Sequence, residues 1–475
     1  MLVGPDGAGK TTVAAEVMRR VGGSCVYFHF LPDSVWRRGP ATEPRPGELV
    51  AKHTGSGSRL LGVVRLLRNL VKAWIAWVRV LRPAVRSGSL VVGDRYLYGY
   101  LAQPTPLKFY GPRWLARLVV GAMPQPDLVV LLEAPVPVLR GRKAEVSEED
   151  LRRELRLWAT VPGPVIRLDA TRPPGRLAEL IVDALALPHR AYPPARGNVV
   201  VPRRPRPVVR VGASLYGPSR RRGLLAHRAA QQAIRALGSG WLPVVGPDRV
   251  VDPELWSELA SELRRLGIQV EHVALYRRSQ RGRSGFSLLA MDGDQATAFV
   301  KVGGDEIARE AEVLELVAAK PPTTFVAPRV VAAGNVSGVQ YAVLSPLPAG
   351  IHVPDFEAPI DEICAEIGAT LSVLRARGDR REGWEPMHGD LTPWNLRRHG
   401  RIRLLFDWER AAWGPPKADQ TLYWAACRAL GRRRGTWRPP EEAAAFWLQR
   451  LGTPGSAREA RLHRAMRREL EAVFG

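Results

Sequence analysis

The chain has 475 residues, which is too long for one ordinary core and suggests roughly three domains of about 150 residues each. Hydrophobic residues make up 45% and charged residues 24%, a composition typical of a globular protein and not of a disordered one. The formal net charge is +24, and nearly all of the basic residues behind it are arginines. These arginines are spread along the whole chain, and no recognised nucleic-acid motif accompanies them. We therefore do not expect nucleic acid to be the main ligand.

No uncharged apolar run in the sequence is long enough to span a membrane. The most apolar stretch, Leu60 to Leu81, is interrupted by basic residues and predicts an amphipathic helix. The segment from Gly4 to Thr12 is polar where a secretory signal would carry its apolar region, and the 3 cysteines lie far apart. These features predict a cytoplasmic protein without a membrane span.

The first 187 residues alternate short apolar runs with longer amphipathic segments. We expect buried strands at Cys25–Phe30, Leu90–Gly93, Asp127–Leu132 and Val165–Leu168. Helices are expected between them, among them Thr11–Val21 and Glu148–Trp158. Strands that alternate with helices predict a parallel sheet covered on both faces.

The segment Gly4–Thr11 fits the phosphate-loop pattern G-x-x-x-x-G-K-[ST], and a helix-forming segment follows it directly. Glycines let backbone N–H groups wrap a phosphate, Lys10 reaches the β- and γ-phosphate oxygens, and the Thr11 hydroxyl binds Mg²⁺. The alternative is a chance glycine-rich turn. We expect ATP to bind through Gly4, Asp6, Gly7, Gly9, Lys10, Thr11 and Thr12. Only Met1–Val3 precede the loop, so we also expect that the natural chain begins a few residues earlier.

Residues 1–187 resemble the thymidylate kinase family of P-loop kinases. The resemblance is carried by the phosphate loop, Val91–Tyr96, Pro126–Glu133 and the basic stretch Arg140–Lys143. It implies that Asp94 and Arg95 bind the acceptor, with Arg95 also catalytic. It further implies a lid that brings basic side chains to the transferring phosphoryl group, namely Arg140, Arg142 and Lys143. The alternatives are a surface ion pair at Asp94–Arg95 and a solvated helix face at Arg140–Lys143.

One segment departs from that family. The family's Arg-Glu-Pro-Gly segment after the second strand helps to hold the nucleotide acceptor, and Phe28–Pro32 stands in its place here. We therefore expect a phosphorylated, nucleotide-like acceptor other than thymidylate.

The middle of the chain carries no recognisable chemistry. Residues 188–207 are rich in proline and arginine, and we expect an extended linker there. A small module at 208–268 is expected to contain helices at Leu224–Leu237 and Pro253–Leu266. From Gln269 the pattern predicts a β-hairpin-rich stretch, then a helix at Asp305–Ala319 and a largely helical remainder.

A second kinase signature lies at Met387–Leu396, where Asp390 precedes Asn395 by five residues and a strand ending at Asp407 follows. Such a set supplies one carboxylate to orient or deprotonate an acceptor hydroxyl, and an amide and a second carboxylate to hold Mg²⁺ on ATP. Upstream, Lys301 on an expected strand and Glu310 on the next helix match a pair that grips the α- and β-phosphates. The alternatives are that Lys301 is an ordinary lysine on an edge strand, and that Glu312 takes the place of Glu310 as its partner.

Residues 270–430 resemble the aminoglycoside phosphotransferase and choline kinase group, through His388, Gly389, Asp390, Asn395, Asp407 and Trp408. The resemblance implies that Asp390 is the catalytic base and that Asn395 and Asp407 are metal ligands. It also implies a nucleotide-covering loop at Gly282–Ser287 and a hinge near Tyr341–Ser345. Members of the group phosphorylate hydroxyls of antibiotics, sugars, choline or amino-acid derivatives.

The sequence therefore predicts a multi-domain protein: an α/β parallel-sheet P-loop kinase domain at 1–187, followed by an α+β, protein-kinase-like bilobal domain at 269–475. The leading hypothesis is a bifunctional kinase that uses ATP and Mg²⁺ to phosphorylate small-molecule acceptors. Two alternatives stay open. Either the first domain is a regulatory nucleotide-binding module without transfer activity, or the chain is an arginine-rich, nucleic-acid-associated ATPase.

Overall fold

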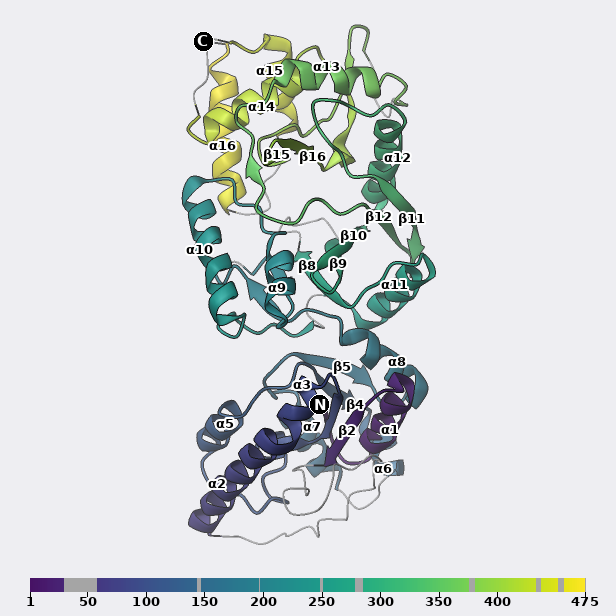
Figure 1. Ribbon diagram of the computed structural model, residues 1–475, viewed down its shortest axis with the longest axis vertical. Helices are drawn as coiled ribbons and strands as arrows, with labels where there is room; N and C mark the ends of the chain where they lie inside the picture. Colours follow the sequence, from purple (N-terminus) through teal and green to yellow (C-terminus); the bar gives the residue numbers. More distant parts are fainter. Residues whose placement is uncertain are drawn as a thin grey trace. The chain divides into compact units, whose positions relative to one another are not determined.

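The computed structural model describes residues 1–29, 58–142, 147–195, 197–247, 251–277, 285–375, 381–432, 437–451 and 457–474. It divides into two compact units (Figure 1). The first unit comprises Met1–Leu187 and Val244–Ser257, and the second comprises Pro188–Pro243 and Glu258–Gly475. The described residues contain no helix that is both long and apolar enough to cross a membrane.

The first unit is built on a parallel sheet, as the alternation of apolar runs and helices predicted. Its strands stand in the order β2-β3-β1-β4-β5. All neighbouring pairs are parallel. The strands are β1 (Leu2–Val3), β2 (Cys25–His29), β3 (Leu90–Asp94), β4 (Val129–Glu133) and β5 (Val165–Asp169). Loops that leave the carboxyl ends of these strands therefore meet along one edge of the sheet, where α/β proteins bind ligands.

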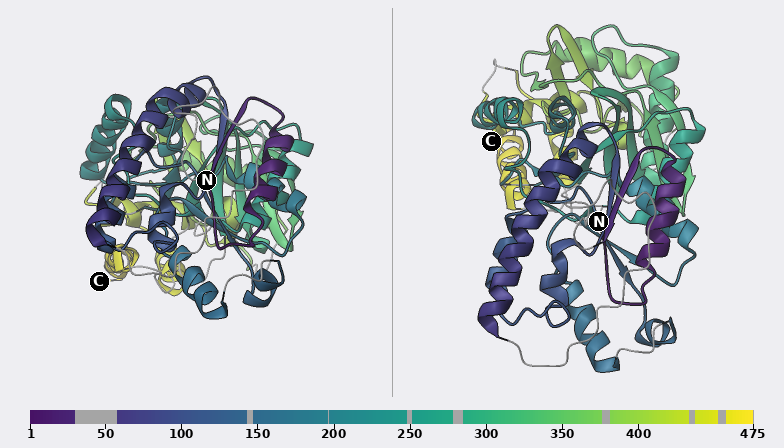
Figure 2. Two further views of the ribbon diagram at one scale, coloured as in Figure 1. Left: turned by 90° about the horizontal axis from the view of Figure 1, so that it is seen from below. Right: turned by 60° about the horizontal axis from the view of Figure 1, so that its bottom comes forward.

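Three helices of this unit were predicted by range and all three are present: α7 has the predicted bounds, and α1 and α2 each begin one residue before the predicted start. The long helix α2 can be followed in dark blue in Figure 2, and it continues through a π-turn at Trp77–Leu81. Helices α1 and α8 pack against each other. The helices are α1 (Lys10–Val21), α2 (Arg59–Ala76), α3 (Arg82–Arg86), α4 (Gly99–Ala102), α5 (Arg113–Gly121), α6 (Val136–Arg142), α7 (Glu148–Trp158) and α8 (Pro174–Ala184).

The first unit also includes a segment from beyond residue 187, which the sequence did not predict. The indole of Trp256, on α11 (Pro253–Arg265), is buried and donates to the carbonyl of Asp183 at 2.8 Å. The Ser257 hydroxyl donates to the Asp183 carboxylate at 2.7 Å. Because Asp183 lies on α8, residues 244–257 complete the packing of the first unit.

Residues 188–207 differ from the expected extended linker, because they form two strands of the second unit's sheet. β6 (Arg190–Tyr192) pairs antiparallel with β7 (Val199–Val201), and β7 pairs with β8 (His272–Arg277). The three valines of β7 are fully buried. Prolines and arginines flank this short apolar run and dominate the local composition, which is why the segment resembled a linker.

The sheet of the second unit is antiparallel, in the order β11-β12-β10-β9-β8-β7-β6. Helix α12 follows β10 and has the predicted bounds. The remaining strands are β9 (Gly285–Asp292), β10 (Gln295–Gly303), β11 (Val330–Val336) and β12 (Val339–Leu344), and the helices before Phe325 are α9 (Arg206–Ala213), α10 (Arg221–Leu237), α11 and α12 (Asp305–Ala319).

The rest of the second unit is mostly helical and holds two small antiparallel sheets, β13-β15-β16 and β14-β17. Trp408 is fully buried in a hydrophobic cluster formed with α12, α13 and the short strands. The elements are β13 (Val353–Pro354), α13 (Ile360–Thr370), β14 (Glu385–Met387), β15 (Leu396–His399), β16 (Ile402–Leu405), β17 (Ala412–Gly414), α14 (Ala418–Ala429), α15 (Glu441–Arg450) and α16 (Ala457–Glu471).

A buried histidine couples the stability of the second unit to pH. His227 on α10 is 2% exposed and shares a 2.6 Å hydrogen bond with the Tyr192 hydroxyl. Burial, aided by the charge of Arg397, lowers the pKa of His227 to about 4. The unfolded chain therefore binds a proton between about pH 6.5 and pH 4 that the folded chain does not bind, so this stabilising contribution is lost as the pH falls through that window.

We expect wild-type protein to lose about 2 kcal/mol of unfolding free energy through His227 when the pH is lowered from 7.5 to 5. Urea unfolding of wild type and His227→Gln at both pH values tests this expectation. The variant should show a smaller difference between the two pH values. An equal difference in both proteins would contradict it.

Candidate active site

The loop between β14 and β15 is held in place by a buried carboxylate. Asp419, in the first turn of α14, accepts hydrogen bonds from the backbone amides of His388 at 2.6 Å and Gly389 at 3.1 Å. Gly389 has φ +76°, and a Cβ there would lie 2.1 Å from the Arg410 carbonyl oxygen. Only glycine fits this left-handed position with backbone so close.

His388 serves the geometry of this loop. Its imidazole is fully buried, packs 4.5 Å from the Trp408 ring between ring centroids, and accepts a 3.2 Å hydrogen bond at Nδ1 from the Asp390 amide. Burial lowers the pKa of His388 to about 4, so the ring is neutral at physiological pH. A neutral ring can accept the hydrogen bond from the Asp390 amide, and this hydrogen bond holds the backbone of Asp390 in position.

Asp390 and Asn395 lie together on this loop. The Asn395 amide donates to the Asp390 carbonyl oxygen at 3.0 Å. Burial raises the pKa of Asp390 to about 7, although the nearby Arg410 opposes the shift. A carboxylate whose pKa is close to neutral is suited to accept a proton from a substrate at physiological pH.

The Lys301 side chain, on β10, joins two carboxylates that are distant in sequence. Its ammonium donates to both Glu310 oxygens at 2.7 Å and to an Asp407 oxygen at 2.5 Å. Burial lowers the pKa of Lys301, but the charges of Asp407 and Glu310 outweigh it and raise the pKa overall. Lys301 is therefore a cation at physiological pH. Glu312 is exposed on the same helix, so the structure places Glu310 at the lysine.

Removing Lys301 should destabilise the second unit, because Glu310 is then a buried carboxylate without its cation. We expect Lys301→Met to lower the unfolding free energy by about 3 kcal/mol, and Lys301→Met/Glu310→Gln to recover most of this loss. Urea unfolding measures both effects. Lys320→Met removes an exposed lysine at the end of α12 and is the control. A single variant as stable as wild type would contradict the expectation.

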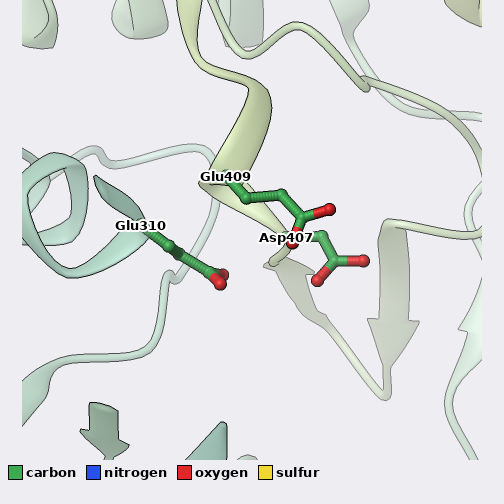
Figure 3. A group of neighbouring side chains, drawn as sticks. All are labelled: Glu310, Asp407 and Glu409. Carbon is green, nitrogen blue, oxygen red and sulfur yellow. The ribbon is translucent and has the colours of Figure 1, made fainter. Parts of the chain in front are cut away.

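Three carboxylates form a candidate metal centre, drawn in Figure 3: Glu310, Asp407 and Glu409, with ligand oxygens within 4.8 Å of one another. Asp407 has φ +70°, a left-handed conformation uncommon for a residue other than glycine. Such backbone strain clusters at functional sites. Carboxylate oxygens suit Mg²⁺. Asp390, Asn395, Lys301 and these carboxylates line one cavity of about 810 Å³.

The phosphate loop of the first unit connects β1 to α1 at the carboxyl edge of the sheet. Gly4, Gly7 and Gly9 all have positive φ. The buried Lys10 ammonium donates to the carbonyl oxygens of Gly4 at 3.0 Å and Pro5 at 2.8 Å. Burial lowers the pKa of Lys10 to about 8. Thr11 is half-buried and Thr12 is exposed in the first turn of α1.

Asp94 is the last residue of β3 and Arg95 follows it, but each side chain contacts a different partner. Buried Asp94 lies 3.3 Å from His29 Nδ1, and Arg95 bonds to Asp6 of the phosphate loop. Arg140 pairs with Glu148 at 3.7 Å, and Arg142 donates to the Ala170 carbonyl at 3.0 Å. Neither of these two contacts involves the phosphate loop. Lys143, part of Phe28–Pro32 and the first half of Gly282–Ser287 lie outside the described residues.

Residues 378–462 match a family model. The family is the phosphotransferase enzyme family. The matched range contains Asp390, Asn395 and Asp407, and this match indicates a phosphotransferase activity in the C-terminal region. It supports the aminoglycoside phosphotransferase-like part of the resemblance. A comparison with curated proteins found no match.

Several residues of both sites had no signal in the sequence. In the C-terminal region, Asp419 lies 29 positions after Asp390 on a helix whose sequence carries no motif. Glu409 directly follows the Asp407–Trp408 pair, but no motif in the sequence marked it as a site residue. In the first unit, Gln103 donates at 2.9 Å to Glu154, whose pKa is raised by burial. Glu154 interacts electrostatically with Asp6, Arg95 and Lys10, so α7 contributes to the phosphate-loop site.

Proposed function

We propose that the second unit transfers the γ-phosphoryl group of ATP to a hydroxyl of a small molecule. The observation that carries this proposal is that Lys301, on β10, lines the same cavity as Asp390 and Asp407, which come from a distant segment of the chain. Lys301, held by Glu310, binds the α- and β-phosphates, as in protein kinases. Asn395 and Asp407 hold Mg²⁺, which neutralises the phosphate charge.

In the proposed reaction the acceptor hydroxyl oxygen forms a bond to the γ-phosphorus, and the bond to the β,γ-bridging oxygen breaks. ADP leaves with that electron pair, and the hydroxyl proton passes to the Asp390 carboxylate. The loop contacts from Asp419 and His388 keep Asp390 in position. Positioning and charge neutralisation supply most of the rate enhancement in phosphoryl transfer.

We further propose that the first unit binds ATP at its phosphate loop and transfers phosphate to a phosphorylated, nucleotide-like acceptor. The positive-φ glycines around buried Lys10, and Arg95 beside Asp6, support this proposal. The alternative is a regulatory nucleotide-binding module. A third candidate is an arginine-rich, nucleic-acid-associated ATPase, which would bind duplex nucleic acid with a steep salt dependence.

The test is a phosphate-acceptor screen of the full chain with γ-labelled ATP. Truncation at residue 190 would remove Trp256 from the first unit, so point variants separate the two activities better. Transfer by the second unit should be lost in Asp390→Asn and kept in Lys10→Ala. Transfer by the first unit should show the reverse pattern. If phosphate transfer to all of the acceptors found persisted both in Asp390→Asn and in Lys10→Ala, the proposal would be refuted.

A further inference from the structure

The segment between the two parts of the first unit also contributes to the second unit's cavity. Helix α9 packs through Val208 against Ala274, Leu289 and Met291 of the sheet. Leu289 is directly opposite Phe299, and Phe299 is two residues before Lys301, so all three side chains lie on the same face. Helix α9 therefore covers the face of the sheet that presents Lys301.

The end of α9 and the loop after it line the same cavity as the phosphotransferase residues. Val211, Leu215, Gly217 and Arg220 share this cavity with Lys301, Asp390 and Asp407. On the sheet side the cavity is apolar, through Leu289, Phe299 and Leu344. Leu215, just after the end of α9, packs against this cluster, so a planar, largely apolar ligand group entering there would contact Leu215 as well as the sheet.

One buried arginine connects this wall to the loop that holds Asn395. Arg397 is 4% exposed and donates to three carbonyl oxygens: Trp394 at 2.8 Å, His352 at 2.8 Å and Gly217 at 2.6 Å. A Cβ on Gly217 would lie 2.8 Å from the guanidinium carbon. The close approach therefore needs glycine at 217, because Arg397 is fixed by its other two acceptors.

We propose that residues 188–243 are an integral wall of the phosphotransferase cavity, and that Arg397 is the positioning residue that couples this wall to the metal-binding loop. The nucleotide base then lies between Leu215, in the segment that follows α9, and the apolar face of the sheet. This inference rests on the proposed function of the second unit. It assigns a role in the reaction to a segment that lies entirely outside residues 378–462.

The coupling has a chemical consequence at the metal. Trp394 directly precedes Asn395, and Arg397 holds the Trp394 carbonyl while it also holds Gly217. Loss of the guanidinium releases both sides at once. Binding of MgATP should therefore weaken, and more Mg²⁺ should be needed at saturating nucleotide. A purely structural role would lower thermal stability without changing the Mg²⁺ requirement of the folded protein.

The experiment uses the full chain with Lys10→Ala as background, so that nucleotide bound by the first unit does not obscure the result. MgATP affinity is measured by calorimetry, and Mg²⁺ half-saturation by ATP turnover. We expect Arg397→Met to raise the Kd for MgATP by about tenfold or more, and to raise the Mg²⁺ half-saturation. Arg397→Lys keeps the charge but not the three-way geometry, and should recover part of the affinity.

Gly217→Ala tests the same contact from the other side of the cavity and should weaken MgATP binding in the same direction. Arg398→Met and Gly240→Ala are matched controls, because Arg398 is exposed and a Cβ on Gly240 meets nothing within 4 Å. If Arg397→Met fails to fold, Arg397→Lys and Gly217→Ala still decide the question.

The outcomes separate this inference from the proposed function. If Asp407→Asn weakens MgATP binding while Arg397→Met, Arg397→Lys and Gly217→Ala bind as the background does, the coupling is wrong and the proposed function stands. If Asp407→Asn also leaves MgATP binding unchanged, both proposals are overturned. Weakened binding in the arginine and glycine variants with unchanged matched controls supports the inference.

Discussion

Asp390→Asn is expected to lower the phosphoryl-transfer rate of the second unit by about 10²- to 10⁴-fold, the usual loss when a general base is removed. The substitution keeps the size of the side chain and removes the charge that accepts the proton. The Kd for MgATP should barely change, because Lys301 and Asp407, and not Asp390, are proposed to hold the nucleotide and its metal. Initial rates at saturating ATP, together with calorimetry, measure the two quantities separately.

Asp407→Asn is the matched comparison for this prediction. It should weaken MgATP binding, because a metal ligand is lost and Lys301 loses one of its two carboxylates. The two variants therefore separate chemistry from binding. A wild-type rate in Asp390→Asn, or loss of ATP binding in Asp390→Asn with retention in Asp407→Asn, would show that the proposed roles are wrong.

Lys10→Ala is expected to reduce the nucleotide stoichiometry of the full chain from about two to about one. Lys10 is the cation that reaches the β- and γ-phosphates in a phosphate loop. In the structure its ammonium is buried against the Gly4 and Pro5 carbonyls, whereas the nearby Arg95 guanidinium is bonded to Asp6. The remaining site should keep its wild-type Kd. Calorimetry with MgATP gives both values.

Lys72→Ala, which removes an exposed lysine on α2, is the control for charge alone. Loss of both nucleotide sites in Lys10→Ala would show that the sites are not independent. An unchanged stoichiometry of two would show that nucleotide binding in the first unit does not depend on the phosphate loop.

Features specified by short stretches of sequence could be predicted well. Helix α12 begins at Asp305 because acidic residues follow Gly304 directly, and its apolar spacing is uninterrupted to Ala319. The parallel sheet of the first unit followed from buried apolar runs that alternate with helices. The loop around Asp390 and the glycine positions of the phosphate loop were visible because each needs particular residue types at fixed spacing.

Pairings between distant segments could not be predicted in this way. The sequence of the three valines at 199–201 does not indicate which strand they pair with. They belong to the sheet because their backbone pairs with β8, a strand more than 70 residues later in the chain. Trp256 looked like any residue of an amphipathic helix, although it completes the first unit.

The candidate site shows the same division between local and long-range information. From the sequence alone we predicted Lys301, Glu310, Asp390, Asn395 and Asp407 as the residues of a phosphotransferase site, and in the structure all five line one cavity. Only the tertiary structure decided what supports them, because Asp419 and Arg397 act through backbone groups of other segments. Every residue has such backbone groups, so the partners of a buried carboxylate or guanidinium leave no pattern in the sequence until the chain has folded.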